Sequence, residues 1–201
     1  GSIASEAKPG QFISVYSNDD SKLLPRPISI CEIDRKNGRL RIVYRVVGYG
    51  TKEFSGCKAG DTLEIMGPLG NGYTLKKDKA ILVAGGIGVP PMLELAKELD
   101  CEKTIVLGYR DELFLNKEFE QYGKVVIATE DGSCGTKGNV LDAIRAESVD
   151  GQVIYSCGPT PMLRALKQYA ADKGIEAWIS LEEKMACGIG ACLACVCKSK
   201  D

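Results

Sequence analysis

The chain has 201 residues, of which 26 are basic, 27 are acidic and 44% are hydrophobic. Its formal net charge of -1 gives no electrostatic attraction to nucleic acid or to an anionic membrane. The absence of histidine excludes a Ser-His-Asp triad, histidine-ligated haem and Rieske-type iron ligation. The apolar run at 80–84 is too short to span a bilayer. We therefore expect a cytoplasmic protein without catalytic side chains of its own, whose chemistry comes from cofactors.

Residues 1–73 are expected to form a β domain. Short stretches with strand character, separated by turn residues, predict four strands, at 11–16, 27–32, 40–47 and 62–65. Four strands are too few to close a Greek-key barrel, which needs about six. The sequence therefore predicts a partial barrel, and we expect strands that precede it to be missing from the amino terminus.

Residues 74–181 change to an alternation of strands and helices. Strands are expected at 80–84, 104–108, 125–128, 152–156 and 177–180, with helices at 92–99, 117–122, 140–147 and 161–173. Strands that alternate with helices favour a doubly wound parallel sheet. Ligands bind at the carboxyl ends of the strands in such sheets.

Two glycine-containing loops follow strands of this predicted sheet and open helices. The first contains Gly85, Gly86 and Gly88, and the second is Cys157-Gly158-Pro159. Either loop alone is compatible with an ordinary tight turn. Together they favour a nicotinamide dinucleotide, because such loops let the backbone approach a pyrophosphate. After the second strand, Asp111 and Glu112 outnumber Arg110, which favours NADH over NADPH.

Two stretches of the β domain have residue types that suit a flavin. In Arg26-Pro27-Ile28-Ser29, the arginine is suited to a diphosphate and the serine to the edge of a flavin ring. The alternative is a surface arginine followed by an edge proline. Gly48-Tyr49-Gly50-Thr51 is equally compatible with a plain turn.

The densest group of candidate metal-ligating residues lies near the carboxyl terminus. Cys187, Cys192 and Cys195 follow the C-x4-C-x2-C spacing typical of plant-type 2Fe-2S ferredoxins. Gly188 and Gly190 lie between the first two cysteines and allow backbone N–H groups to approach sulfur. The alternative, a structural zinc module, normally has two separated ligand pairs and often histidine.

The order of these motifs resembles the ferredoxin-NADP reductase superfamily over essentially the whole chain. It is most similar to the iron-sulfur electron-transfer subunits of NAD-dependent dihydroorotate dehydrogenases of Gram-positive bacteria, which share the stretch 185–192. The resemblance implies a partial Greek-key FAD-binding barrel at 1–73, an NAD-binding α/β domain at 74–181 and a 2Fe-2S segment at 182–201.

The resemblance also implies roles for individual residues. FAD would be bound by residues of the β domain: Arg26, Pro27, Ile28, Ser29, Val43, Tyr44, Arg45, Gly50 and Thr51. NAD(H) would be bound by Gly85, Gly86, Gly88, Cys157, Gly158 and Pro159. The cluster ligands would be Cys187, Cys192 and Cys195.

The implied function is electron transfer between a partner and NAD. An FMN-containing catalytic subunit would oxidise dihydroorotate to orotate for pyrimidine biosynthesis, within a heterotetramer. Other flavin-based complexes share most of these motifs, so a subunit of an NADH-dependent ferredoxin oxidoreductase, a hydrogenase or a sulfide dehydrogenase is the nearest alternative. The family places a fourth cysteine more than ten residues beyond the third, whereas only Cys197 follows here. We therefore expect the natural tail to be longer.

Overall fold

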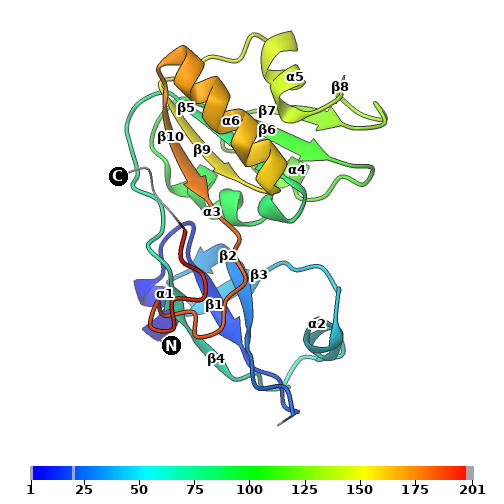
Figure 1. The fold of residues 1–201 in the computed structure, drawn as a ribbon, viewed down its shortest axis with the longest axis vertical. Helices are drawn as coiled ribbons and strands as arrows, with labels where there is room; N and C mark the ends of the chain where they lie inside the picture. The colour runs from blue at the N-terminus through cyan, green and yellow to red at the C-terminus, as the bar shows by residue number, and fades with distance from the viewer. Residues whose placement is uncertain (1, 20, 198–201) are drawn as a thin grey trace. The chain divides into compact units, whose positions relative to one another are not determined.

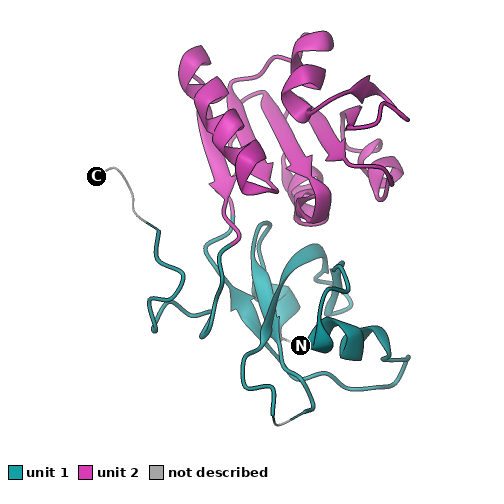
Figure 2. Ribbon diagram, turned by 45° about the vertical axis from the view of Figure 1, so that its right-hand side comes forward, with its two compact units in different colours: residues 1–72, 183–201 teal, residues 73–182 magenta. Residues whose placement is uncertain are grey.

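The computed structural model describes residues 2–19 and 21–197. Contacts divide the chain into two compact units (Figure 2). The first consists of Gly1–Gly72 with Glu183–Asp201, and the second of Tyr73–Glu182. The end of the predicted cluster segment, 198–201, and Gly1 lie outside the described residues.

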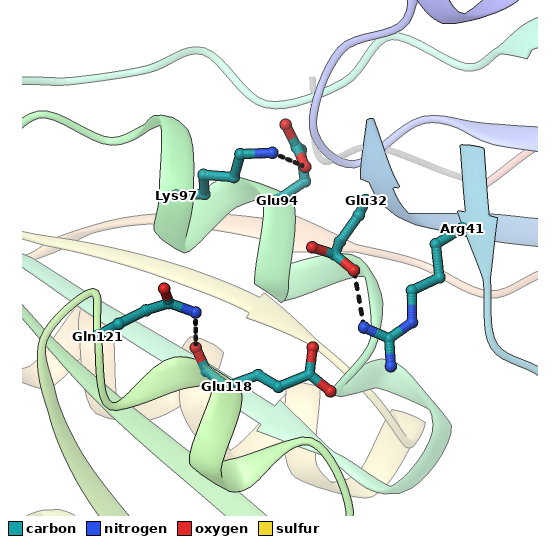
Figure 3. Close-up of polar contacts among 6 residues, drawn as sticks. All are labelled: Glu32, Arg41, Glu94, Lys97, Glu118 and Gln121. Carbon is teal, nitrogen blue, oxygen red and sulfur yellow. Dashed lines mark hydrogen bonds and ion pairs between the residues drawn. The ribbon is translucent and has the colours of Figure 1, made fainter. Parts of the chain in front are cut away.

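The first unit is built on an antiparallel sheet with the strand order β3-β2-β1-β4 (Figure 1). Side chains alternate between its faces, and Ile13, Val15, Ile28 and Ile30 belong to the core cluster of the unit. Exposed Arg41 of β3 and half-buried Glu32 of β2 form an ion pair of 2.7 Å (Figure 3). The elements of this unit are α1 Ser2–Glu6, β1 Phe12–Val15, β2 Arg26–Asp34, β3 Arg39–Ile42, α2 Tyr49–Ser55 and β4 Ile65–Leu69.

Three details of the β domain differ from the sequence prediction. The strand predicted at 40–47 ends at Ile42, and Val46 and Val47 lie exposed outside the sheet. The strand predicted at 62–65 lies instead at Ile65–Leu69 and includes Pro68, which an edge strand tolerates. The stretch considered as a turn at 48–51 begins helix α2.

The second unit confirms the predicted parallel sheet with helices. Its strand order is β10-β9-β5-β6-β7-β8, and every strand pair is parallel (Figure 1). The short strand β8 was not predicted. The strands are β5 Ala80–Gly85, β6 Lys103–Tyr109, β7 Lys124–Thr129, β8 Thr136–Lys137, β9 Val153–Cys157 and β10 Glu176–Ser180. The helices are η1 Gly86–Gly88, α3 Pro91–Glu98, α4 Asn116–Phe119, α5 Val140–Ala146 and α6 Thr160–Lys173.

The central strands of this sheet are buried on both faces. Ile81 and Val83 of β5 pack into a cluster with residues of α5 and α6, such as Ile144 and Leu166. Continuous burial explains why β5 is an apolar run and why β9 does not alternate between apolar and charged residues. Among the described helices, none has the length and apolarity needed to cross a membrane.

Helix α3 carries a fully buried carboxylate. The Glu94 side chain has 0% exposure and forms an ion pair of 3.3 Å with Lys97, one turn further along the helix (Figure 3). A buried carboxylate is costly without compensating partners. Lys97 is 40% exposed, so this ion pair links the interior to the surface.

The order of the strands creates a topological switch point between β5 and β9. The chain runs from β5 to β6, β7 and β8 on one side and returns to β9 on the other side of β5. Loops that leave two adjacent parallel strands toward opposite faces create a crevice at their carboxyl ends. The two loops predicted to bind a nucleotide are the ones that leave β5 and β9.

Candidate functional site

The loops after β5 and β9 are in direct backbone contact. Ala84 pairs with Cys157 at the end of the two strands. A Cβ placed on Gly88 would overlap the carbonyl group of Cys157, and one placed on Gly85 would lie 2.7 Å from Met162 Sδ. Gly88 is fully buried, so nothing larger than hydrogen fits there without moving the backbone. The structure thus brings together the two glycine loops that the sequence places 70 residues apart.

Backbone geometry explains two further glycines of these loops. Gly86 has φ 53° and Gly158 has φ 153°, values that side chains with a Cβ rarely adopt. At the start of α3, Pro90 and Pro91 have no N–H, and Met92 and Leu93 donate to the carbonyls of Val89 and Pro90. Residues 90–93 at this helix start therefore offer no free N–H group to a pyrophosphate. At the start of α6, the N–H of Leu163 donates to the carbonyl of Pro159. Thr160 and Met162 precede this first hydrogen bond of the helix.

Cys157 is a buried, neutral thiol at the end of β9. Burial raises the pKa of Cys157 to about 12, with a smaller contribution from Glu182, whose own pKa is raised by burial. The cysteine is 1% exposed and pairs with Ser180 across β9 and β10. Next to it, the Tyr73 hydroxyl donates to the Ser156 carbonyl at 2.9 Å. Tyr73 and Ser180 were not identified from the sequence as neighbours of this strand end, because neither residue lies in a motif.

In the first unit, Arg26 lies across the start of α2. A Cβ on Gly50 would be 3.0 Å from Arg26 Nε, and Arg26 Nη1 donates to the Leu24 carbonyl at 2.6 Å. The Thr51 hydroxyl accepts the N–H groups of Val47 and Gly48 at 3.0 and 3.1 Å. A guanidinium beside the positive end of a helix suits a diphosphate.

The other residues predicted to bind FAD differ in how far their side chains are buried. Ile28 is 6% exposed and packs in the core, so its side chain faces away from any ligand on the open side of β2. Pro27 and Arg45 are exposed, whereas Ser29 and Val43 are half-buried. Tyr44 packs edge-on against Phe54 at 6.4 Å between ring centroids, and burial raises the pKa of Tyr44.

We expect Arg26→Ala to weaken FAD binding by roughly 100-fold, because charge-assisted hydrogen bonds to a diphosphate contribute about 1.5–3 kcal/mol each. Arg26→Lys should recover only part of this loss, since lysine keeps the charge but not the planar fork. Titration of cofactor-free protein with FAD, followed by flavin fluorescence, measures both effects. Arg41→Ala is the control, since Arg41 pairs with Glu32. Equal losses for Arg26→Ala and Arg41→Ala would contradict the assignment.

We call residues 185–197 the cysteine loop. In this loop, Cys187 is held as a thiolate before any metal binds. Its sulfur accepts the N–H of Cys192 at 3.4 Å. Hydrogen bonds from the backbone of Cys192 and then of Ile189 lower the pKa of Cys187 to about 6. Gly188 and Gly190, with φ 70° and 80°, make the tight turn that aims these N–H groups at sulfur. N–H groups directed at sulfur are the surroundings that an iron-sulfur cluster requires.

The structure brings Cys192 to Cys187 but does not assemble a complete ligand set. Among the described residues, no three Cys, Asp or Glu side chains are placed to hold a metal ion. The Cys197 thiol lies 3.7 Å from a carboxylate oxygen of Glu183. The donors are nevertheless of the right chemistry, because thiols on a glycine-rich loop are the ligands of 2Fe-2S clusters.

The lowered pKa makes Cys187 reactive in cofactor-free protein. Its thiolate should persist down to about pH 6 and be protonated below it, so alkylation by iodoacetamide should fall as the pH drops through that value. Denaturant should move this midpoint up toward the ordinary thiol value of about 8.5. Buried Cys157 should stay unmodified across the same range. Mass spectrometry of the alkylated peptides measures this, and a native midpoint near 8.5 for Cys187 would refute the hydrogen-bond effect.

Comparison with known proteins first defines the class. A model of the oxidoreductase FAD-binding domain matches residues 5–73. The solved structure of a ferredoxin NADP+ reductase from Neisseria gonorrhoeae has a TM-score of 0.68 at 16% identity and covers 89% of both chains. The NADH-dependent reduced ferredoxin-NADP oxidoreductase has a TM-score of 0.88 at 31% identity, covering 96% of this chain and 73% of that one. The chain is thus a flavin-dependent oxidoreductase subunit with the ferredoxin-NADP reductase fold.

The family follows from the cysteine loop and from sequence relatives. A model of the iron-sulfur cluster binding domain of dihydroorotate dehydrogenase B matches residues 182–201. The dihydroorotate dehydrogenase B (NAD(+)) electron transfer subunit of Fusobacterium nucleatum is 46% identical over 100% of this chain and 82% of its own length. The subunit from a Geobacillus strain is also 46% identical, over 94% of this chain and 77% of its length. The chain belongs to the family of dihydroorotate dehydrogenase B electron transfer subunits, which confirms the resemblance.

Proposed function

We propose that this protein transfers electrons between a dihydroorotate-oxidising partner subunit and NAD, through a 2Fe-2S cluster and FAD. The observation that carries the proposal is the 46% identity over the whole chain to electron transfer subunits of dihydroorotate dehydrogenase B. In this assignment the partner contains FMN, converts dihydroorotate to orotate for pyrimidine biosynthesis and assembles with this chain as a heterotetramer. Co-expression with that subunit, followed by co-purification on a size-exclusion column, tests the assembly.

The FAD site is proposed to use the contact between Arg26 and α2. Arg26, Gly50 and Thr51 surround the place where a helix start and a guanidinium meet. Arg26 balances the charge of a diphosphate, and Gly50 leaves room for the arginine because it has no Cβ. FAD bound there exchanges either one or two electrons, which joins one-electron cluster chemistry to two-electron nicotinamide chemistry. Pro27, Ser29, Val43, Tyr44 and Arg45 complete the proposed pocket, with Ile28 contributing its backbone.

The NAD site is proposed at the switch point of the second unit. Gly85, Gly86 and Gly88 with Cys157, Gly158 and Pro159 form two loops in backbone contact, so a dinucleotide can approach the main chain closely. Cys157 stays neutral and can donate a weak hydrogen bond without adding negative charge. Exposed Asp111 and Glu112 after β6 favour NADH, since a 2'-phosphate would be repelled.

The cluster site is proposed to use Cys187, Cys192 and Cys195 as ligands. The hydrogen bonds to Cys187 stabilise negative charge on its sulfur before a metal arrives. Cofactor loading would move the three cysteines together, which a loop with two left-handed glycines permits.

An anaerobic ultraviolet-visible spectrum of the purified protein, before and after NADH, tests this function. Flavin bands over an iron-sulfur background should bleach when NADH is added. A colourless protein that binds zinc and ignores NADH would overturn the proposal in favour of a structural module.

A second candidate is a subunit of an NADH-dependent ferredoxin oxidoreductase complex. The 31% identity and the TM-score of 0.88 to such a protein support this alternative. Reduction of NAD by dihydroorotate after addition of the partner subunit would favour the first candidate. Reduction of ferredoxin without any dihydroorotate dependence would favour the second.

A further inference from the structure

Strand β1 of the first unit has two faces with different surroundings. Ile13 and Val15 belong to the core cluster. Phe12 and Ser14 therefore point to the opposite side of the sheet, because strand side chains alternate. Ser14 is nevertheless only 1% exposed. A segment outside the sheet must cover it.

The cysteine loop provides that cover through Gly188. A Cβ on Gly188 would lie 3.1 Å from Ser14 Oγ, 3.2 Å from Leu69 Cδ1 and 3.7 Å from Phe12 Cε2. Ser14 and Phe12 are on β1, and Leu69 is the residue of β4 that pairs with Phe12. We call these three residues the seat of the cysteine loop. The loop rests on the seat at its glycine, one residue from the candidate ligand Cys187.

The face that carries the seat continues onto β2. Ser14 pairs with Pro27, and Phe12 pairs with Ser29. Directly opposite residues of antiparallel strands point to the same face, with Cβ atoms about 4.5–5.5 Å apart. Pro27 is exposed and Ser29 is half-buried, so the face is open on β2 and covered on β1. Only the width of one strand therefore separates the cysteine loop from the strand assigned to FAD.

We propose that Ser14 and Gly188 are positioning residues for electron transfer, an inference that rests on the proposed function. Their contact fixes the distance between Cys187 and the face of β2 that carries Pro27 and Ser29. One electron passes between the cofactors at a time, and no bond to Ser14 or Gly188 forms or breaks. A methyl group at position 188 would lie closer to Ser14 Oγ and Leu69 Cδ1 than ordinary van der Waals contact, so the loop has to move away from the seat or these side chains have to shift.

Gly190 provides a matched control for this contact. Both glycines have left-handed backbone angles, φ 70° at 188 and 80° at 190, so alanine strains the backbone at either position. A Cβ on Gly190 would meet nothing within 4 Å. Gly190→Ala therefore reports the effect of backbone strain alone, and Gly188→Ala adds the collision with the seat.

The first test compares both variants in the full chain loaded with FAD and cluster, after iron, sulfide and flavin contents are matched. Stopped-flow mixing with NADH separates flavin bleaching from the later cluster reduction. Bleaching should be equal in the two variants, and cluster reduction should be several-fold slower in Gly188→Ala, because electron transfer slows as the distance between the two cofactors grows. Adding Ser14→Ala to Gly188→Ala should restore part of the rate, since it removes the 3.1 Å neighbour.

A second readout needs no cofactor. Hydrogen exchange of the amides in 185–192, measured by mass spectrometry on the cofactor-free chain, should be faster in Gly188→Ala than in Gly190→Ala. Equal exchange together with equal cluster reduction would overturn the inference. If NADH fails to bleach flavin in the unsubstituted chain, the proposed function fails, and the exchange comparison still decides whether the loop is seated.

Discussion

Gly88→Ala is expected to lower the free energy of unfolding by about 3 kcal/mol and to weaken NADH binding at least about tenfold. A Cβ at this buried position would overlap the carbonyl of Cys157 and the nitrogen of Gly158, which are backbone atoms and cannot turn away as a side chain can. The loops after β5 and β9 must therefore separate, which displaces the main chain that the dinucleotide is proposed to approach. Thermal unfolding and NADH titration of the FAD-loaded protein measure the two effects.

Gly86→Ala is the matched control for Gly88→Ala. Gly86 lies in the same loop and has φ 53°, but a Cβ there would meet nothing within 4 Å. Left-handed strain alone costs about 1 kcal/mol. If the two variants unfold at the same temperature and bind NADH equally, close packing of the two loops does not support the site.

Cys187→Ala is expected to eliminate the cluster while leaving FAD in place. The variant removes the sulfur that accepts hydrogen bonds from the backbone N–H groups of the loop. Cluster retention should therefore fall by at least about 100-fold. Arg26 and α2, which are assigned to FAD, do not depend on this sulfur. Iron, sulfide and flavin analysis of the purified protein measures the outcome.

Two other cysteines test the specificity of that result. Cys57 is exposed at the end of α2, and Cys57→Ala should leave iron and flavin contents unchanged. Cys197→Ser should also retain iron, because the Cys197 thiol lies against Glu183 rather than against Cys187. Loss of iron in Cys197→Ser would identify that cysteine as the fourth ligand.

Several features of the fold were predictable because they depend on local patterns. The strands predicted at 80–84 and 152–156 are observed as β5 and β9, and every residue of these two strands is buried in the sheet. The helix at 161–173 was predicted from its amphipathic period and is observed at Thr160–Lys173. Short-range periodicity and spacing determine these elements, as they do the cysteine motif.

Other features had no local signal. Tyr44 and Val46 continue the alternation of Leu40 and Ile42, but the strand ends at Ile42, since only pairing with β2 could show where the sheet stops. Helix α2 was not predicted from the sequence, because its start, Gly48-Tyr49-Gly50-Thr51, has the composition of a turn.

By itself, the sequence determined the family, the partial barrel followed by a parallel sheet, and the residue types that suit FAD, NAD and a 2Fe-2S cluster. Tertiary structure alone decided that Gly88 contacts Cys157, that Arg26 lies on Gly50, and that the cysteine loop rests on Ser14. The physical reason is distance along the chain. Motif spacing reports what neighbouring residues can do, whereas close approach between distant residues is decided by strand order and register.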